Sequence, residues 1–93
     1  MSQETCRADV WLWRARLFKT RTLATRFIEE GRVRLVRGEV PARLDKPSRT
    51  LRPGDGLVLA LSGRLIAVRV EALGARRGPA SEARSLYSEL PPD

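Results

Sequence analysis

Histidine is absent from this 93-residue sequence, and cysteine occurs only once, at Cys6. The absence of histidine removes the most common general base and a common zinc ligand. A single cysteine cannot form a disulfide within the chain, which is typical of proteins in a reducing compartment. We therefore expect a cytoplasmic protein that holds no metal and no cofactor.

Long apolar segments are also missing. No apolar run reaches the length of a signal peptide or a transmembrane helix, so we expect no membrane partner. Ninety-three residues suffice for one small domain and leave no room for a separate catalytic domain. The carboxylates of Asp9, Asp45 and Asp55 form no recognisable acid–base pair, and we predict that the protein is not an enzyme.

Acidic residues are in the minority. The sequence has 18 Lys and Arg against 11 Asp and Glu, a net charge of +7, and 16 of the 18 basic residues are arginine. Residues 7–37 hold nine of the basic residues and only three acidic ones. Guanidinium groups bind phosphate through two parallel hydrogen bonds and also stack on bases. The sign of the charge and its clustering predict a nucleic acid as the partner.

The first third of the chain has helical spacing. Apolar residues recur at intervals of three and four over residues 7–18, which predicts a first helix. Thr20 is placed to cap a second helix over residues 21–30, because its hydroxyl can accept a hydrogen bond from a first-turn amide. Gly31 is placed to end that helix in the left-handed conformation. The link between the helices is very short, which predicts a helical hairpin.

From residue 32 onward, apolar and polar residues alternate, which is typical of half-buried strands. After a first strand at Val33–Leu35, a second is predicted over Val40–Leu44, where Pro41 favours an edge position because proline cannot donate a ladder hydrogen bond. Two further strands, Leu57–Leu61 and Leu65–Glu71, are predicted to form a hairpin.

The last segment predicts a short helix that begins near Pro79. Four residues share one face of it, namely Ala83, Leu86, Tyr87 and Leu90, and Pro91 and Pro92 end it. The predicted fold is α+β, with an N-terminal helical hairpin packed on a small, mostly antiparallel β-sheet and a short C-terminal helix. Its parts are a flexible start over residues 1–6, an RNA-binding domain over 7–75 and a C-terminal helical tail over 76–93.

The joint between the two predicted helices combines cations with a helix N-terminus. Arg16, Lys19 and Arg21 flank this joint, where free amides and the helix dipole attract an anion. Trp13 leaves two interpretations open. If Trp11 lies in the core, Trp13 points away from it and can stack on a base; alternatively, Trp13 packs beneath the C-terminal helix.

A resemblance to known proteins rests on five segments: Arg7–Trp13, Ala15–Arg21, Gly31–Leu35, Lys46–Ser48 and Pro53–Asp55. In order and in most spacings they are similar to the S4-type RNA-binding domain. The likeness is greater still to the ribosome-associated 15-kDa heat-shock protein family. One difference is Val10, which stands where that family has a lysine after the aspartate.

This resemblance implies RNA binding on the surface of the helical hairpin, with ribosomal RNA of the large subunit as the partner. It also implies a role on a stalled subunit that still carries peptidyl-tRNA, in ribosome quality control or heat-shock recycling. Together with the charge pattern, it gives the predicted RNA-binding set: Arg7, Asp9, Trp13, Arg14, Arg16, Lys19, Thr20, Arg21, Arg26, Arg32 and Lys46. We expect a monomer.

Other functions stay open on the residues alone. The basic surface also suits another nucleic acid, either DNA or tRNA, or an acidic protein surface, without a ribosomal role. The sequence has no recognition helix with base-reading side chains and no lysine-rich amphipathic helix, which favours structured RNA over DNA or a membrane. We therefore expect binding by counterion release and fit of shape, with little reading of base sequence.

Overall fold

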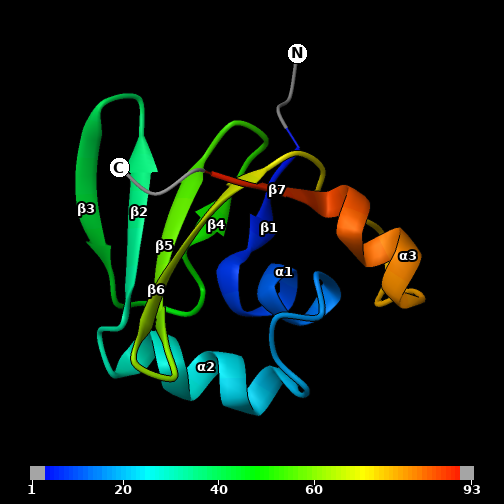
Figure 1. The fold of residues 1–93 in the computed structure, drawn as a ribbon, viewed down its shortest axis with the longest axis horizontal. Helices are drawn as coiled ribbons and strands as arrows, with labels where there is room; N and C mark the ends of the chain where they lie inside the picture. Colours follow the sequence, from blue (N-terminus) through cyan, green and yellow to red (C-terminus); the bar gives the residue numbers. More distant parts are fainter. Residues whose placement is uncertain (1–3, 91–93) are drawn as a thin grey trace.

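The structure is a computed structural model that describes residues 4–90. Residues 1–3 of the predicted flexible start, and Pro91 and Pro92 at the predicted end of the last helix, lie outside the described residues. The elements, in chain order, are β1 (Cys6–Arg7), α1 (Ala8–Arg14), α2 (Arg21–Glu29), β2 (Val33–Arg37), β3 (Val40–Leu44), β4 (Thr50–Leu51), β5 (Gly56–Leu61), β6 (Arg64–Val70), α3 (Ala80–Ala83), the 3-10 turn η1 (Arg84–Leu86) and β7 (Tyr87–Glu89). Figure 1 shows the predicted α+β architecture, which is confirmed.

The N-terminal helices form the predicted hairpin, but α1 is shorter than expected. It ends at Arg14, because Arg16 adopts a left-handed conformation with φ of 59° that a helix cannot continue through. Thr20 caps α2 as predicted, and its Oγ1 accepts a hydrogen bond of 3.1 Å from the Leu23 amide. Gly31, with φ of 77°, lies just after the end of α2.

The five-stranded sheet has the order β3-β2-β5-β6-β7, and every neighbouring pair is antiparallel. The alternation seen in the sequence sets its two faces, since Val33 and Leu35 are buried while Arg34 between them is exposed. β3 lies at the edge, as Pro41 predicted. A second, two-stranded sheet pairs β1 with β4 and so links the start of the hairpin to the loop after β3.

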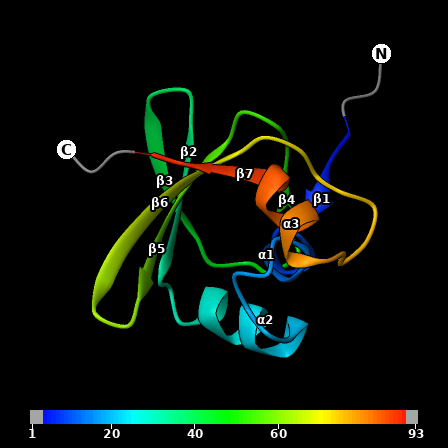
Figure 2. The same ribbon diagram turned by 45° about the vertical axis from the view of Figure 1, so that its right-hand side comes forward.

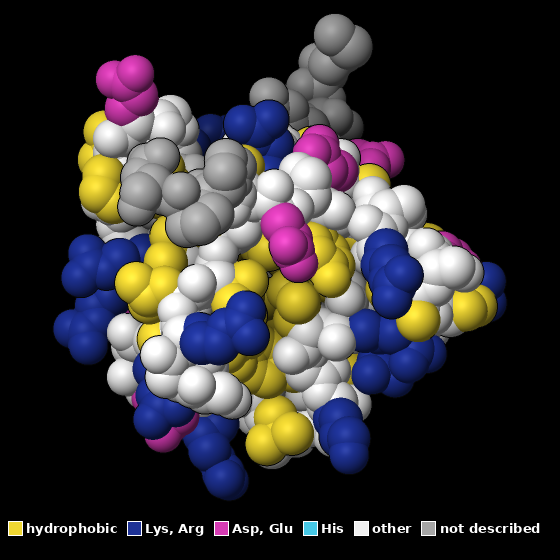
Figure 3. Space-filling view, viewed as in Figure 1, with side chains coloured by type: hydrophobic (Ala, Val, Ile, Leu, Met, Phe, Trp, Pro, Cys, Tyr) yellow, Lys and Arg dark blue, Asp and Glu magenta, His cyan; other side chains and the backbone are white. Residues whose placement is uncertain are grey.

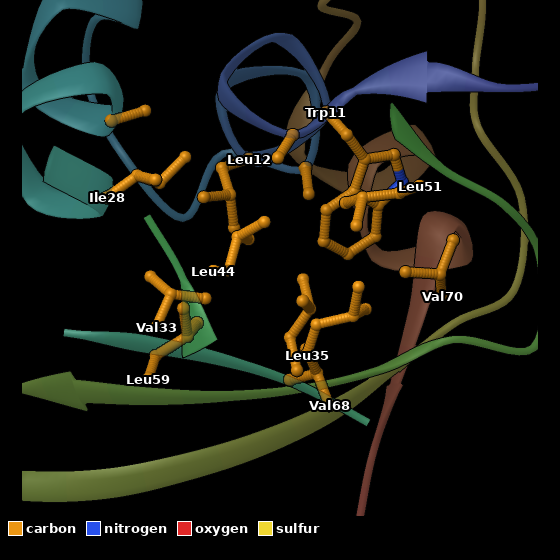
Figure 4. Close-up of a cluster of buried hydrophobic side chains, with 14 of the residues drawn as sticks. Trp11, Leu12, Ile28, Val33, Leu35, Leu44, Leu51, Leu59, Val68 and Val70 are labelled. Carbon is orange, nitrogen blue, oxygen red and sulfur yellow. The ribbon is translucent and has the colours of Figure 1, made fainter. Parts of the chain in front are cut away.

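The core lies between the hairpin and one face of the sheet. In Figure 4, Trp11 and Leu12 from α1 point toward Leu35 and Val68 from the sheet; all four side chains are at most 1% exposed. Burying each such side chain contributes about 2 kcal/mol. The indole of Trp11 also donates a hydrogen bond of 2.9 Å to the Ala72 carbonyl, which satisfies its one polar group inside the core.

The C-terminal helix is present, but its predicted extent was wrong. α3 is a single turn, η1 follows it, and the chain then becomes β7, which pairs with β6 through Val70↔Tyr87. The physical reason is the open edge of β6, whose backbone groups need partners that β7 supplies. Leu86 is buried as expected, whereas Tyr87 and Leu90 do not share a helical face with it. The proposed division at residue 76 stays a prediction.

Candidate nucleic-acid interface

A shallow hollow on the surface lies where the two helices of the hairpin begin. It is lined by Arg7, Asp9, Arg21, Thr22 and Thr25. Arg7 and Asp9 flank the start of α1, while Arg21 and Thr22 belong to the first turn of α2. The hollow therefore combines two guanidinium groups and the Thr22 hydroxyl beside a helix N-terminus, which together suit an anion.

The buried Asp9 side chain holds the residues around this hollow in place through hydrogen bonds. Its carboxylate is buried and accepts hydrogen bonds from Arg7 Nε (3.1 Å) and a terminal Arg7 nitrogen (3.0 Å). It also accepts from the Thr25 hydroxyl at 3.1 Å and from the Val10 amide at 2.8 Å. Because its oxygens are occupied in this way, Asp9 positions Arg7 and joins α1 to α2, while the half-exposed guanidinium of Arg7 faces the solvent.

The loop after β3 is bonded to the start of α1, next to the residues that line the hollow. The amides of Ala8 and Asp9 donate to the carbonyls of Arg49 (2.8 Å) and Pro47 (3.3 Å), which ties this loop to the start of α1. Lys46 and Arg49 are both exposed there. The structure thus brings Lys46 close to the hairpin, although 32 residues of sequence separate it from α1. Arg49 was missed, and its only signal in the sequence is a basic residue in a loop.

The joint between the helices is exposed at Lys19, Thr20 and Arg21. Thr20 is engaged as the helix cap, so Lys19 and Arg21 supply the charge at this point. Arg16 is exposed too, but it points elsewhere: its Nε donates a hydrogen bond of 2.6 Å to the Gly78 carbonyl. The three cations predicted as one cluster are therefore divided: Lys19 and Arg21 lie at the joint, and Arg16 contacts the segment before α3.

Arg14 and Trp13 also contact the C-terminal part of the chain. A terminal nitrogen of Arg14 donates to the Gly74 carbonyl at 2.9 Å and lies 3.5 Å from the Cys6 sulfur. Burial raises the pKa of the Cys6 thiol, and the charge of Arg14 partly offsets that rise. Arg77 lies over the Trp13 ring, 5.7 Å from its centroid, and donates to the Trp13 carbonyl. One face of the Trp13 ring is thereby covered by Arg77, in the loop before α3.

Arg26 and Arg32 complete the predicted set, and both are exposed. Arg26 lies in the last turn of α2, and the Arg32 guanidinium lies 5.7 Å from the centroid of the Phe27 ring. Among residues 4–90, no group of three or more His, Cys, Asp or Glu is arranged to hold a metal ion. No helix in the same range is long and apolar enough to cross a membrane.

The chain is similar to several known proteins. The family model described as "S4 domain" matches residues 6–35, which span β1, the helical hairpin and the start of β2. Heat shock protein 15 of Escherichia coli K12 is 40% identical over 83 residues, which cover 89% of this chain. The chain spans only 59% of the length of that relative.

Two further relatives are covered more completely. The RQC P-site tRNA stabilizing factor of Listeria innocua is 31% identical over 87 residues, 91% of this chain and 89% of that protein. Among solved structures, Heat Shock Protein 15 of Vibrio cholerae, described as trimeric, superposes with a TM-score of 0.80 at 34% identity. That match covers 94% of this chain and 83% of the Vibrio chain.

Proposed function

This chain belongs to the S4-domain family that includes Heat shock protein 15 and the RQC P-site tRNA stabilizing factor, and on that premise we propose that it binds structured RNA on the ribosome. The observation that carries the proposal is the hollow at the start of the hairpin, where buried Asp9 holds Arg7 beside Arg21. A guanidinium fixed in this way loses little conformational freedom when it binds a phosphate.

The proposed mechanism is recognition of a folded RNA backbone. Arg7 and Arg21 line the hollow, and Lys46 and Arg49 lie in the loop whose backbone is tied to the start of α1. Each of these four cations can neutralise one phosphate with release of a counterion. The hydroxyl of Thr22 adds a donor at the same place, whereas the Thr25 hydroxyl donates to Asp9. No strand or helix of residues 4–90 presents a row of base-reading side chains, so shape and charge determine the fit.

We further propose that the RNA is ribosomal RNA of the large subunit, bound when the subunit still carries peptidyl-tRNA. The name of the Listeria relative, RQC P-site tRNA stabilizing factor, supports this narrower role. A role in heat-shock recycling has its support in the names of the Escherichia coli and Vibrio relatives. The expected location is the cytoplasm and the expected state a monomer, although the Vibrio relative was solved as a trimer.

Charge reversal at one cation of the hollow and one of the neighbouring loop tests the proposal. The double variant Arg21→Glu and Lys46→Glu replaces two exposed cations that form no ion pair within residues 4–90, so the fold should survive. Each phosphate contact contributes on the order of 1 kcal/mol and its reversal costs more, so affinity should fall at least about a hundredfold. Binding is measured by sedimentation with purified large subunits and by crosslinking followed by sequencing of the bound RNA.

The matched control reverses two exposed arginines on β6, Arg64→Glu and Arg69→Glu, and changes the net charge by the same amount. The control should weaken binding much less. The proposal fails if the folded double variant still sediments with large subunits as the unchanged protein does. Crosslinks to tRNA or to DNA alone would favour the other nucleic-acid partners considered above.

A further inference from the structure

Residues 72–79, which we call the strap, connect β6 to α3 and pass along the outside of α1 (Figure 2). Side-chain hydrogen bonds fix the strap to the helix at both ends. Trp11 and Arg14 donate to the carbonyls of Ala72 and Gly74, each at 2.9 Å. Arg16 donates to Gly78 at 2.6 Å, and Arg77 of the strap donates back to the Trp13 carbonyl at 3.1 Å.

These contacts hold three guanidinium groups against the strap, and none of the three is in an ion pair; the carboxylate at the strap, that of Glu82, lies against Gly78 and is paired with Arg76 at 3.1 Å. Arg14, Arg16 and Arg77 form no ion pair within residues 4–90, and their described partners are carbonyls, the Cys6 sulfur and the Trp13 ring. In Figure 3, basic side chains gather at the right of the view, below and beside α3. Like charges held together on a surface repel one another, and a bound anion relieves that repulsion.

Two of the three guanidinium groups also keep their terminal nitrogens available to bind an anion. Arg16 and Arg77 each use only Nε for a hydrogen bond to a carbonyl. Their terminal nitrogens form no hydrogen bond within the described residues, and these are the pair that binds two oxygens of one phosphate. Arg77 is held further by the Trp13 ring beneath it. Both guanidinium groups are thus oriented before any ligand arrives.

We infer that the strap is a second RNA-contacting element, in which Arg16 and Arg77 bind phosphates of the same RNA that occupies the hollow. This inference rests on the proposed function and extends the interface along α1 to the C-terminal part of the chain. Trp13 then acts as a positioning residue for Arg77 and does not stack on a base. The Arg16 conformation, with φ of 59°, keeps its side chain directed at the strap.

The salt dependence of RNA binding distinguishes a direct contact between Arg77 and a phosphate from a purely structural role of Arg77. The variant Arg77→Gln is compared with Arg84→Gln, which removes the same charge from an exposed position in η1. The dissociation constant of a labelled RNA hairpin of mixed sequence is measured over a range of salt concentrations. Loss of one phosphate contact should reduce the slope of log K against log salt by about 0.9 and weaken binding roughly fivefold. Arg84→Gln should change neither value.

A structural role alone would lower affinity and leave the slope unchanged, and that result would overturn the inference. Arg77→Lys keeps the charge but loses the fixed guanidinium, so it should keep the slope and weaken binding only slightly. Thermal unfolding of each variant confirms that it is folded under the assay conditions. If Arg77→Gln binds as the unchanged protein does while Arg21→Glu with Lys46→Glu loses binding, the strap inference fails and the proposed function stands. If the unchanged protein does not bind the hairpin or large subunits, the proposed function itself fails.

Discussion

Two arginine–aspartate pairs in this molecule have the same chemistry and different surroundings. In each, an aspartate that is 2–3% exposed accepts two hydrogen bonds from one guanidinium, at 3.0–3.1 Å for Arg7–Asp9 and 2.9–3.0 Å for Arg37–Asp55. Arg7 and Asp9 are two residues apart, whereas Arg37 and Asp55 are eighteen apart. The first pair lies at the start of the helical hairpin, and the second joins β2 to the turn before β5.

The difference lies in what else each arginine contacts. Arg37 also donates to the Thr50 carbonyl at 3.3 Å, so its charge is used inside the fold. The Arg7 guanidinium has no hydrogen-bond partner besides Asp9 within residues 4–90, and half of the side chain is exposed beside the hollow. A count of basic residues treats the two arginines alike. The structure separates a cation that is used inside the fold from one that faces the solvent, and we propose that the second binds phosphate.

The largest expected effect is a loss of stability when the Arg37–Asp55 pair is broken. Replacing Asp55 with alanine leaves Arg37 without its partner and the Arg52 amide without its acceptor. Breaking a buried ion pair costs about 3–5 kcal/mol, and because Arg37 is 35% exposed we expect the lower end, about 3 kcal/mol. Urea denaturation measures the loss in the free energy of unfolding. RNA affinity of the folded fraction should not change, and a large drop in that affinity would contradict the separation of the two pairs.

Asp9 should affect both properties. Asp9→Ala removes the acceptor shared by Arg7, Thr25 and the Val10 amide. Stability should fall by about 2 kcal/mol, because buried donors on α1 and α2 lose their partner. RNA affinity should fall as well, because Arg7 is no longer held in place. Denaturation and titration with a labelled RNA hairpin are compared on the same preparation, and a loss of stability with unchanged affinity would contradict the positioning role.

Much of the fold follows from local patterns in the sequence. The helical hairpin was predicted by apolar spacing and by the Thr20 cap, and β3 was placed at an edge by Pro41. The last strand was not predicted, because Leu86, Tyr87 and Leu90 also fit a helical face locally. Only the open edge of β6, a feature of the folded chain, decides in favour of β7.

The candidate site was only partly predictable for the same reason. Lys19, Thr20 and Arg21 follow from local signals at a helix start. Three features of the site connect residues far apart in the sequence or depend on the packed core. They are the burial of Asp9, the hydrogen bond between Ala8 and Arg49, and the strap contacts of Arg14 and Arg16. A single sequence carries no direct signal for such pairings, so the resemblance supplied residue types at positions but not what each side chain touches.

Replacing each of the two arginines with alanine tests whether Arg7 serves binding and Arg37 serves stability. Arg7→Ala should weaken RNA binding about tenfold, which corresponds to about 1.4 kcal/mol, because it removes a phosphate donor at the hollow. Its effect on stability should be smaller than that of Arg37→Ala, since half of the Arg7 side chain is exposed and the Thr25 hydroxyl and the Val10 amide still donate to Asp9. Arg37→Ala should show the reverse order, with a larger loss of stability than of affinity. If the two variants lost RNA affinity and stability to the same extent, the distinction between the two arginines would be wrong.

Acid should weaken the Arg37–Asp55 pair in a defined direction. Burial alone would raise the pKa of Asp55, but the hydrogen bonds from Arg37 and from the Arg52 amide, with their charges, hold that pKa below its ordinary value of 3.8. The hydrogen bond to Asp55 raises the pKa of Arg37, so the arginine stays charged throughout. A carboxylate whose pKa is lower in the folded state than in the unfolded state stabilises the protein above the unfolded value. That contribution is lost as the pH falls through the lower, folded value.

The difference in unfolding free energy between the unchanged protein and Asp55→Asn, which does not titrate, should therefore be constant at neutral pH. It should narrow only as the pH falls below 3.8. Urea denaturation at a series of pH values measures this gap, and a gap that narrows already near neutral pH, or persists undiminished in strong acid, would contradict the assignment.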